Sequence, residues 1–182
     1  MMIILASSSP TRAKILTENG INFEQISFEF DESKISKDRA PHIYVQMVVK
    51  AKKEQFFKTY LHAKNVLFAD SCVACEGKIL GKAADENEAS DMLWLQSGKV
   101  CSVFSAMIFT GENFELLNVS ETAYEFDKFS RDDVQSYLES GEWRGKAGAM
   151  TIENFNKKYI ISQQGETSTA MGFNVKILKA FL

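Results

Sequence analysis

A polar turn near the start of the chain carries the first side chains that could bind an anion. The run SSSPTR at residues 7–12 follows a short apolar stretch and opens a helix, with Ser9 as the expected N-cap and Pro10 at the first helical position. The N–H groups of a helix N-terminus point outward and the guanidinium of Arg12 adds a fixed fork of donors, so the turn suits phosphate oxygens. On capping alone, the simpler interpretation is favoured, which is a capped helix with a surface arginine.

A carboxylate follows an apolar run in the first half of the chain. Residues 65–70 (NVLFAD) predict a buried strand that delivers Asp70 at its C-terminal end, where open α/β sheets place the groups that face a ligand. Burying a carboxylate without a partner is unfavourable, so we expect Asp70 to face a cleft, a cation or a metal. A turn or cap aspartate is an equally good interpretation.

Several lysines stand beside glycines or in a helical run. Lys82 and Lys146 each follow a glycine. Each alone is an ordinary turn lysine, but together with Arg12 they could form one phosphate clamp. The helical lysines at positions 50, 52 and 53 favour, as a run, a solvated helix face.

Other chemistries have less support in the sequence. Cys72 and Cys75 have the CxxC spacing, but no second CxxC or histidine pair follows for a zinc site, and both fall on an expected strand. His42 and His62 are the only histidines, and neither stands in a recognisable catalytic context. The absence of GxxxxGK[ST] and GxGxxG motifs argues against ATP-dependent kinases and dinucleotide enzymes.

The elements that must position these side chains alternate along the chain. Apolar periodicity predicts strands at residues 2–6, 23–30, 65–70, 100–109, 114–124 and 158–162, and helices at residues 10–20, 41–62, 85–98, 130–141 and after Gly172. Residues 110–113 (TGEN) predict a hairpin turn between two of the strands. This order predicts a mixed-sheet α/β fold in a single domain over residues 1–182.

The composition excludes several classes of protein. The 182 residues are 45% hydrophobic and 25% charged, with only 10 glycines and 2 prolines, which excludes disordered and collagen-like chains. The net charge of −3 argues against wrapping a nucleic-acid polymer, so a bound anion must meet a local basic pocket. No signal peptide or membrane-length apolar run is present, and the three cysteines favour reduced thiols. We therefore expect a soluble, cytoplasmic protein without a membrane partner.

Six segments in order resemble the Maf family of nucleoside triphosphate pyrophosphatases. They are LASSSPTR at residues 5–12, FDES at 30–33, ADS at 69–71, GKAADENEA at 81–89, LQSG at 95–98 and GEWRGKAGA at 141–149. The resemblance runs from Leu5 to about Asn174. It implies an elongated mixed β-sheet flanked by helices, with two lobes and a central cleft, as in inosine triphosphate pyrophosphatase. Family members often form homodimers, so the resemblance leaves a homodimer open.

The resemblance also implies a reaction and the residues that perform it. A nucleoside triphosphate would be hydrolysed between its α and β phosphates with a divalent cation, Mg or Mn. Asp70 matches the family's proton acceptor, and Lys82 matches a phosphate-binding lysine. The family's helical lysine stands eight residues after a tyrosine, which gives Lys52, and Lys50 is the alternative. The remaining implied roles are substrate binding by Ser8, Arg12 and Lys146 and metal binding by Glu32 together with Asp70.

Three positions that the family links to base preference depart from its patterns. Thr11, Ser71 and Glu153 do not match the set associated with pyrimidine triphosphates. Glu153 resembles the subgroup that acts on 7-methylguanosine triphosphate, but that subgroup's tryptophan at position 11 is missing. The resemblance therefore implies the class of reaction and leaves the base open, whether a canonical pyrimidine or a modified base.

Two alternatives to an active hydrolase stay open. The family is also linked to arrest of septum formation, so the chain could be a nucleotide-binding regulator of cell division without turnover. A degenerate member that binds nucleotide without hydrolysing it is the other alternative. The presence of Arg12, Glu32, Asp70 and Lys82 together favours catalysis, because a pure binder needs no water-activating acid beside its phosphate clamp.

Overall fold

The computed structural model describes residues 2–182, which divide into two compact units. The first unit comprises the chain up to Ser71 together with Phe104–Ser120 and Glu166–Leu182, and the second comprises Cys72–Val103 and Glu121–Gly165. One sheet of seven strands has the order β2-β1-β3-β5-β6-β7, with β4 paired to β3. Its strands are β1 Ile3–Ala6, β2 Phe23–Ile26, β3 Val66–Cys75, β4 Lys78–Leu80, β5 Val100–Thr110, β6 Glu115–Phe126 and β7 Ile160–Gln164. The predicted mixed-sheet α/β fold is confirmed, since parallel and antiparallel pairs occur in one sheet.

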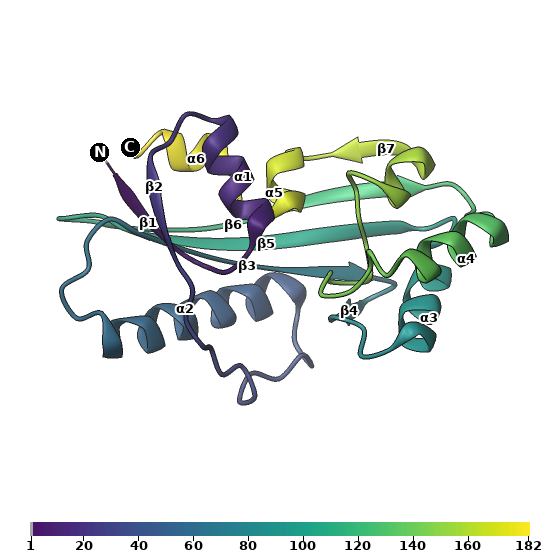
Figure 1. Ribbon diagram of the computed structural model, residues 1–182, viewed down its shortest axis with the longest axis horizontal. Helices are drawn as coiled ribbons and strands as arrows, with labels where there is room; N and C mark the ends of the chain where they lie inside the picture. The colour runs from purple at the N-terminus through teal and green to yellow at the C-terminus, as the bar shows by residue number, and fades with distance from the viewer. Residues whose placement is uncertain (1) are drawn as a thin grey trace. The chain divides into compact units, whose positions relative to one another are not determined.

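In the first unit, helices cover both faces of the strands. The helices α1 (Pro10–Glu18) and α6 (Val175–Lys179) lie over one face, and α2 (Pro41–Thr59) lies over the other (Figure 1). One cluster of buried side chains joins β1, β3 and β5 to α1 and α6; it includes Leu5, Leu16, Leu67, Ala69, Phe109 and Leu178. On the opposite face, Phe56 of α2 packs edge-on against Phe68 of β3, with ring centroids 5.2 Å apart.

The alternation of side chains along β3 separates two neighbouring polar residues. Successive residues of a strand point to opposite faces, so Ala69 belongs to the α1–α6 cluster while Phe68 contacts α2. By the same alternation Asp70 lies on the α2 face and Ser71 lies on the α1 face. Their partners agree, since Lys52 of α2 bonds Asp70 and Arg12 of α1 bonds Ser71.

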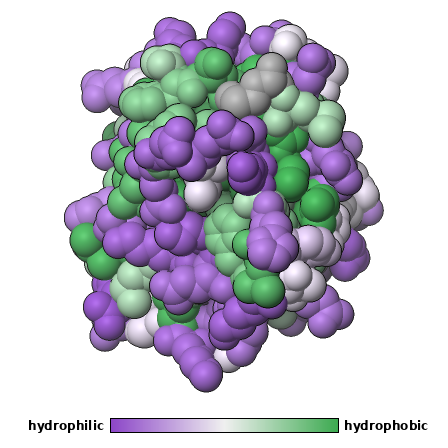
Figure 2. All heavy atoms as spheres, turned by 90° about the vertical axis from the view of Figure 1, so that its left-hand side faces the viewer, coloured by the Kyte–Doolittle hydropathy of each residue, from purple (hydrophilic) through white to green (hydrophobic). Residues whose placement is uncertain are grey.

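The hairpin between β5 and β6 leaves aromatic side chains at the surface of the first unit. Phe114 is 44% exposed and Phe181 near the chain end is 46% exposed, and their rings lie 6.0 Å apart. Figure 2 shows one face of the molecule, on which apolar side chains form patches among hydrophilic ones.

The second unit packs two helices and an aromatic cluster. The helices α3 (Glu86–Gln96) and α4 (Arg131–Ser140) contact each other, and the 3₁₀ helix η1 (Phe155–Tyr159) precedes β7. Phe155 stacks on Tyr137 with centroids 4.6 Å apart and meets Phe129 edge-on at 5.1 Å. Trp143 is buried, and its ring N–H donates to the carbonyl of Leu138 at 3.0 Å.

The predicted helix starts are confirmed because they depend on local hydrogen bonds. The Ser9 hydroxyl accepts from the Arg12 N–H at 3.4 Å, and Ser130 caps α4 in the same way. The Asp85 carboxylate caps α3 by accepting from the Glu88 N–H at 2.9 Å. The short helix after Gly172 is also present, as α6.

Several predicted boundaries were wrong, and packing explains most of them. The second strand stops at Ile26 rather than at residue 30, because Phe28 leaves the sheet and packs on Phe56 of α2 at 5.3 Å. The second helix stops at Thr59 rather than at residue 62, where the Tyr60 N–H still bonds the Phe56 carbonyl. The strand predicted for 158–162 begins only at residue 160, because the preceding segment forms η1.

The strand that carries Asp70 does not end there, and this corrects the prediction of a strand-terminal carboxylate. β3 continues for five residues to Cys75, and its last residues pair with β4. Asp70 is tolerated inside a buried strand because Lys52 supplies the opposite charge. The helix α5 (Thr167–Met171) was not predicted.

Candidate active site

Lys52 of α2 and Asp70 of β3 form an ion pair. The Lys52 ammonium donates to Asp70 Oδ1 at 2.6 Å, and the two side chains are only 17% and 15% exposed. Burial lowers the pKa of Lys52, and the neighbouring positive charge of Arg12 adds to this, whereas the carboxylates of Asp70 and Glu32 oppose it. Lys52 is therefore close enough to Asp70, Glu32 and Arg12 to interact with their charges. The family resemblance had predicted that these residues share a site.

Arg12 lies on the other side of β3, held by three acceptors. Its Nη1 donates to Ser7 Oγ at 3.2 Å, its Nη2 to Ser71 Oγ at 3.4 Å and its Nε to the Gly172 carbonyl at 3.5 Å. Burial lowers the pKa of Arg12 and the charge of Asp70 raises it. An arginine stays protonated in proteins, so this is a fixed, partly desolvated cation.

The turn before Arg12 is itself anchored. Ser7 Oγ accepts from the Ser9 N–H at 3.2 Å, and the side-chain amide of Gln25 on β2 donates to the Ser7 carbonyl at 2.7 Å. Ser8 lies between these contacts with its side chain exposed, and Thr11 is half-buried in the first turn of α1.

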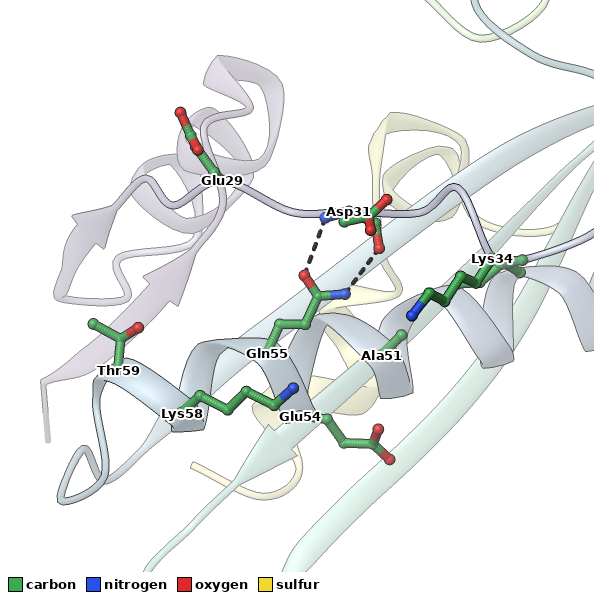
Figure 3. A pocket seen from close by; sticks show the side chains of 9 residues that line it. Glu29, Asp31, Lys34, Ala51, Glu54, Gln55, Lys58 and Thr59 are labelled. Atoms are coloured by element: carbon green, nitrogen blue, oxygen red, sulfur yellow. Dashed lines mark hydrogen bonds between the residues drawn. The ribbon is translucent and has the colours of Figure 1, made fainter.

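The segment that carries Glu32 is fastened to α2. The Gln55 amide clamps the backbone of Asp31, accepting from its N–H at 3.0 Å and donating to its carbonyl at 2.8 Å (Figure 3). One residue earlier, the ring of Phe30 lies 5.1 Å from the Lys52 ammonium. Glu32 is exposed. Its carboxylate therefore projects from a short segment with fixed points on helix α2.

A groove of about 540 Å³ runs between this segment and α2. Glu29, Asp31, Glu54 and Lys58 contribute charges of both signs to its lining, and the Gln55 clamp lies at its wall (Figure 3). The lining includes neither Lys52 nor Asp70. The groove is therefore separate from the Lys52–Asp70 ion pair.

Within the first unit, the structure brings together five of the predicted residues: Arg12, Glu32, Lys52, Asp70 and Ser71. Lys50, the alternative helical lysine, is exposed and has no part in this cluster. Ser8 and Thr11 belong to the turn and helix start that hold Arg12.

The remaining predicted residues lie in the second unit, where two glycine-containing segments run side by side. Lys82 pairs with Ala147 as an isolated antiparallel bridge, and the Gly148 N–H donates to the Gly81 carbonyl at 2.7 Å. Lys146 is thus in the segment next to Lys82. Glu153 is exposed in the turn that precedes η1.

Gly148 is the glycine of the GEWRGKAGA segment that a close approach to another strand requires. Its φ is +62°, and a Cβ there would lie 3.0 Å from the Cβ of Val73. The buried Gln96, which sequence reasoning missed, donates to the Gly148 carbonyl at 2.6 Å. This part of the motif therefore serves to bring the Lys146 segment against the Lys82 segment.

The donor set of the first unit suits a hard divalent cation. Among residues 2–182, no group of three or more histidine, cysteine or acidic side chains could by itself hold a metal ion. Asp70 and Glu32 supply two carboxylates, and Mg²⁺ is typically bound by one or two carboxylates with substrate phosphates and water. The residues present therefore fit a metal that binds together with a phosphate ligand. Over the same residues, no helix is long and apolar enough to cross a membrane.

Known proteins match this chain over nearly its whole length. A family model described as "Maf-like protein" matches residues 2–182. The chain is 40% identical over 184 residues to a nucleoside triphosphate pyrophosphatase of Campylobacter jejuni, covering 100% of both chains. It is 41% identical over 178 residues to one from a Nitratiruptor species, covering 97% of this chain and 96% of the other. A relative of the same name from Helicobacter pylori is 33% identical over 97% of this chain and 92% of its own.

Among solved structures, a HAM1 protein from Coxiella burnetii aligns with a TM-score of 0.40 and 14% identity over 72% of this chain and 75% of its own. The likeness is too weak to carry an argument.

Proposed function

The chain belongs to the Maf-like protein family, and we propose from this premise that it is a nucleoside triphosphate pyrophosphatase. It hydrolyses a nucleoside triphosphate between the α and β phosphates and releases a monophosphate and pyrophosphate. The observation that carries the proposal is the partly buried Lys52–Asp70 pair with Arg12 in its field. Relatives that match the chain end to end bear the name of this activity.

The two cations suit a polyanionic substrate. Arg12 offers planar N–H donors from one side of β3, and Lys52 offers an ammonium from the other. Fixed positive charges in a partly desolvated site stabilise the negative charge that grows on a leaving pyrophosphate. These positive charges therefore attract the triphosphate, and the same charges favour cleavage of the bond between its α and β phosphates.

Asp70 is the proton acceptor in this proposal. Lys52 holds Oδ1 at 2.6 Å and orients the carboxylate, so that Oδ2 accepts the proton of the attacking water. The water oxygen forms a bond to the α phosphorus, the bond from that phosphorus to the bridging oxygen breaks, and its electron pair leaves with pyrophosphate. Lys82 and Lys146 are proposed to bind phosphate oxygens, with Ser8 as a further ligand in the turn before Arg12.

A divalent cation, Mg or Mn, would be held by Asp70 and Glu32. When bound, it supplies positive charge that neutralises the phosphate oxygens. The clamp of Gln55 on Asp31 supports this role of Glu32, because it fixes the backbone one residue away.

The proposed location of this activity is the cytoplasm. All three cysteines are buried and outside any disulfide, which suits the reducing cytoplasm. Hydrolysis there would remove unwanted nucleotides from the pool. Thr11, Ser71 and Glu153 remain the predicted positions for base preference, and a homodimer remains the predicted assembly.

A panel of canonical and modified nucleoside triphosphates tests the proposal. Pyrophosphate release is measured for each with Mg or Mn, using the wild-type chain and Asp70→Asn. Release from at least one triphosphate by the wild type alone supports a hydrolase. If no nucleotide is hydrolysed but one raises the melting temperature, the chain is a nucleotide binder instead.

A further inference from the structure

A buried hydroxyl on β5 lies behind the Arg12 side chain. Ser105 is only 1% exposed, and its Oγ donates to the Thr169 carbonyl at 2.6 Å. The same Oγ lies 2.6 Å from the Oγ of Ser71. Ser71 is in turn an acceptor for Arg12. The buried Ser105 therefore connects the Thr169 carbonyl of α5, by way of Ser71, to the guanidinium.

The direction of these bonds follows from counting protons. A serine hydroxyl has one proton, and a carbonyl can only accept. Because Ser105 gives its proton to the Thr169 carbonyl, Ser105 can only accept in its 2.6 Å contact with Ser71, and Ser71 is the donor there. The Gly172 carbonyl, 3.3 Å from Ser71 Oγ, is the more distant of the two acceptors that this proton can reach. A lone pair of Ser71 is then free to accept from Arg12 Nη2. The bonds run in one sense, from Arg12 through Ser71 and Ser105 to the backbone.

Ser105 also fixes the second acceptor of Arg12. The Thr169 carbonyl accepts from the Gly172 N–H at 3.1 Å as well as from Ser105. This closes the turn whose Gly172 carbonyl accepts from Arg12 Nε. The fit is tight, since a Cβ at Gly172 would lie 2.7 Å from Arg12 Cγ. Two of the three bonds of the guanidinium thus depend on groups that Ser105 holds.

The same count bears on Ser71, which the family patterns associate with base preference. Its only proton has two acceptors within the protein, Ser105 Oγ at 2.6 Å and the Gly172 carbonyl at 3.3 Å, so it has none to offer to the edge of a base. Its oxygen faces Arg12, which is a cation suited to phosphate. A change at Ser71 therefore acts first on the phosphate-binding arginine, whatever base the nucleotide carries.

We infer that Ser105 is a positioning residue for Arg12, which acts through the Ser71 hydroxyl and the Gly172 carbonyl and sets the affinity for the phosphate chain independently of the base. The inference rests on the proposed function, because it takes Arg12 as a phosphate ligand. The alternative is that the Ser105 hydroxyl only provides a hydrogen-bond partner inside the core, and this alternative predicts a different outcome. Loss of the hydroxyl would then lower stability and leave phosphate affinity unchanged.

A double-mutant cycle separates the two roles. Inorganic pyrophosphate is the probe, and its dissociation constant is measured by calorimetry for the wild type, Ser105→Ala, Arg12→Ala and the double variant, together with each melting temperature. We expect Ser105→Ala to weaken binding by roughly 3- to 30-fold, which lies inside the range of coupling within one hydrogen-bond network. In the Arg12→Ala background, Ser105→Ala should cause no further loss. Ser105→Thr keeps the hydroxyl and should bind as the wild type does.

Ser120→Ala is the matched control. Ser120 is a half-buried hydroxyl of the same unit that donates to Asn118 and accepts from the Asn174 amide. Within residues 2–182 its hydrogen bonds do not include Arg12, Ser71 or Gly172, so its loss should leave pyrophosphate affinity unchanged. If Ser105→Ala proves unfolded, Ser71→Ala takes its place in the cycle, with the same expectation.

Two results would overturn the inference. One is an equal loss of affinity from Ser105→Ala with and without Arg12, and the other is a lower melting temperature with unchanged affinity. Failure of the proposed function looks different. In that case Arg12→Ala itself leaves pyrophosphate binding as it was, or the wild type binds none, and the inference falls with it.

Discussion

The ammonium of Lys52 lies 2.6 Å from Oδ1 of Asp70, joining the middle of α2 to the middle of β3. Removing one partner of a partly buried pair leaves a charge without compensation, which is more harmful than the pair itself is helpful. Under the proposed function, the contact favours Lys52 over the exposed Lys50 as the lysine of the helical run that acts on a bound phosphate.

Lys52→Met should lower kcat/KM for pyrophosphate release by at least about 100-fold, the scale of losing one preorganised charge contact in a reaction. Lys50→Met is the matched control, because Lys50 is exposed on the same helix, and it should keep the wild-type value. Steady-state assays of both variants decide the point. Equal losses in the two variants would mean that the Lys52–Asp70 contact has no special part in the reaction.

The pH dependence of the reaction should report Lys52. Burial holds its pKa below the ordinary value for lysine, although Asp70 opposes the shift. Phosphate binding needs the protonated ammonium, so kcat/KM should fall as the pH rises through this lowered pKa, before an exposed lysine would titrate. Arginine keeps its charge at these pH values, so Lys52→Arg should move the alkaline limb upward. An alkaline limb at the same pH in both proteins would assign it to another group.

Gly172→Ala should weaken substrate binding through Arg12. A Cβ would lie 2.7 Å from Arg12 Cγ and 3.0 Å from its Nε, and the φ of +149° disfavours any side chain. We expect KM to rise about 10-fold, the effect of losing a net hydrogen bond to a charged group. Gly20→Ala is the control, since its φ is +67° with nothing within 4 Å. It should lower stability by about 1–2 kcal/mol at unchanged KM. Equal KM values in the two variants would contradict this account of Gly172.

Gln55→Ala should loosen the segment that carries Glu32. Two hydrogen bonds to the Asp31 backbone are lost, each with a net contribution of about 0.5–1.5 kcal/mol. Amide hydrogen exchange should speed up in residues 28–33, and the Mg concentration for half-maximal activity should rise. Gln46→Ala, on the same helix, should change neither quantity. Unchanged exchange in residues 28–33 would show that the aromatic contacts alone hold the segment.

The sequence predicts best those features that depend on neighbours in the chain. The helices predicted to begin near Ser9, residue 85 and residue 130 do so, because each start depends on a side chain that caps a backbone N–H three residues later. Boundaries that depend on distant packing were wrong. Phe28 and Phe30 alternate as in a strand, but Phe28 packs on Phe56 and Phe30 lies under Lys52, which no local pattern encodes.

The site residues also divide into those that the sequence indicates and those that only the folded structure reveals. The family resemblance pointed to Arg12, Glu32, Lys52 and Asp70, but it left Lys50 open, because a run of lysines does not say which one faces a strand. Ser105 did carry a signal, since a lone serine in the apolar run VFSAMIF needs a partner when buried. Gln55 carried none, because a glutamine on a helix is ordinary until the segment that it clamps is in place.

The central claim is hydrolysis between the α and β phosphates with Asp70 as proton acceptor, and product analysis tests it most directly. A hydrolysable triphosphate is incubated with the wild type and with Asp70→Asn, and nucleotides, pyrophosphate and orthophosphate are separated and quantified. We predict equal amounts of monophosphate and pyrophosphate from the wild type. The folded Asp70→Asn variant should form these products at least about 100-fold more slowly, as expected for loss of a general base. Diphosphate with orthophosphate as the products, or full activity in Asp70→Asn, would contradict the claim.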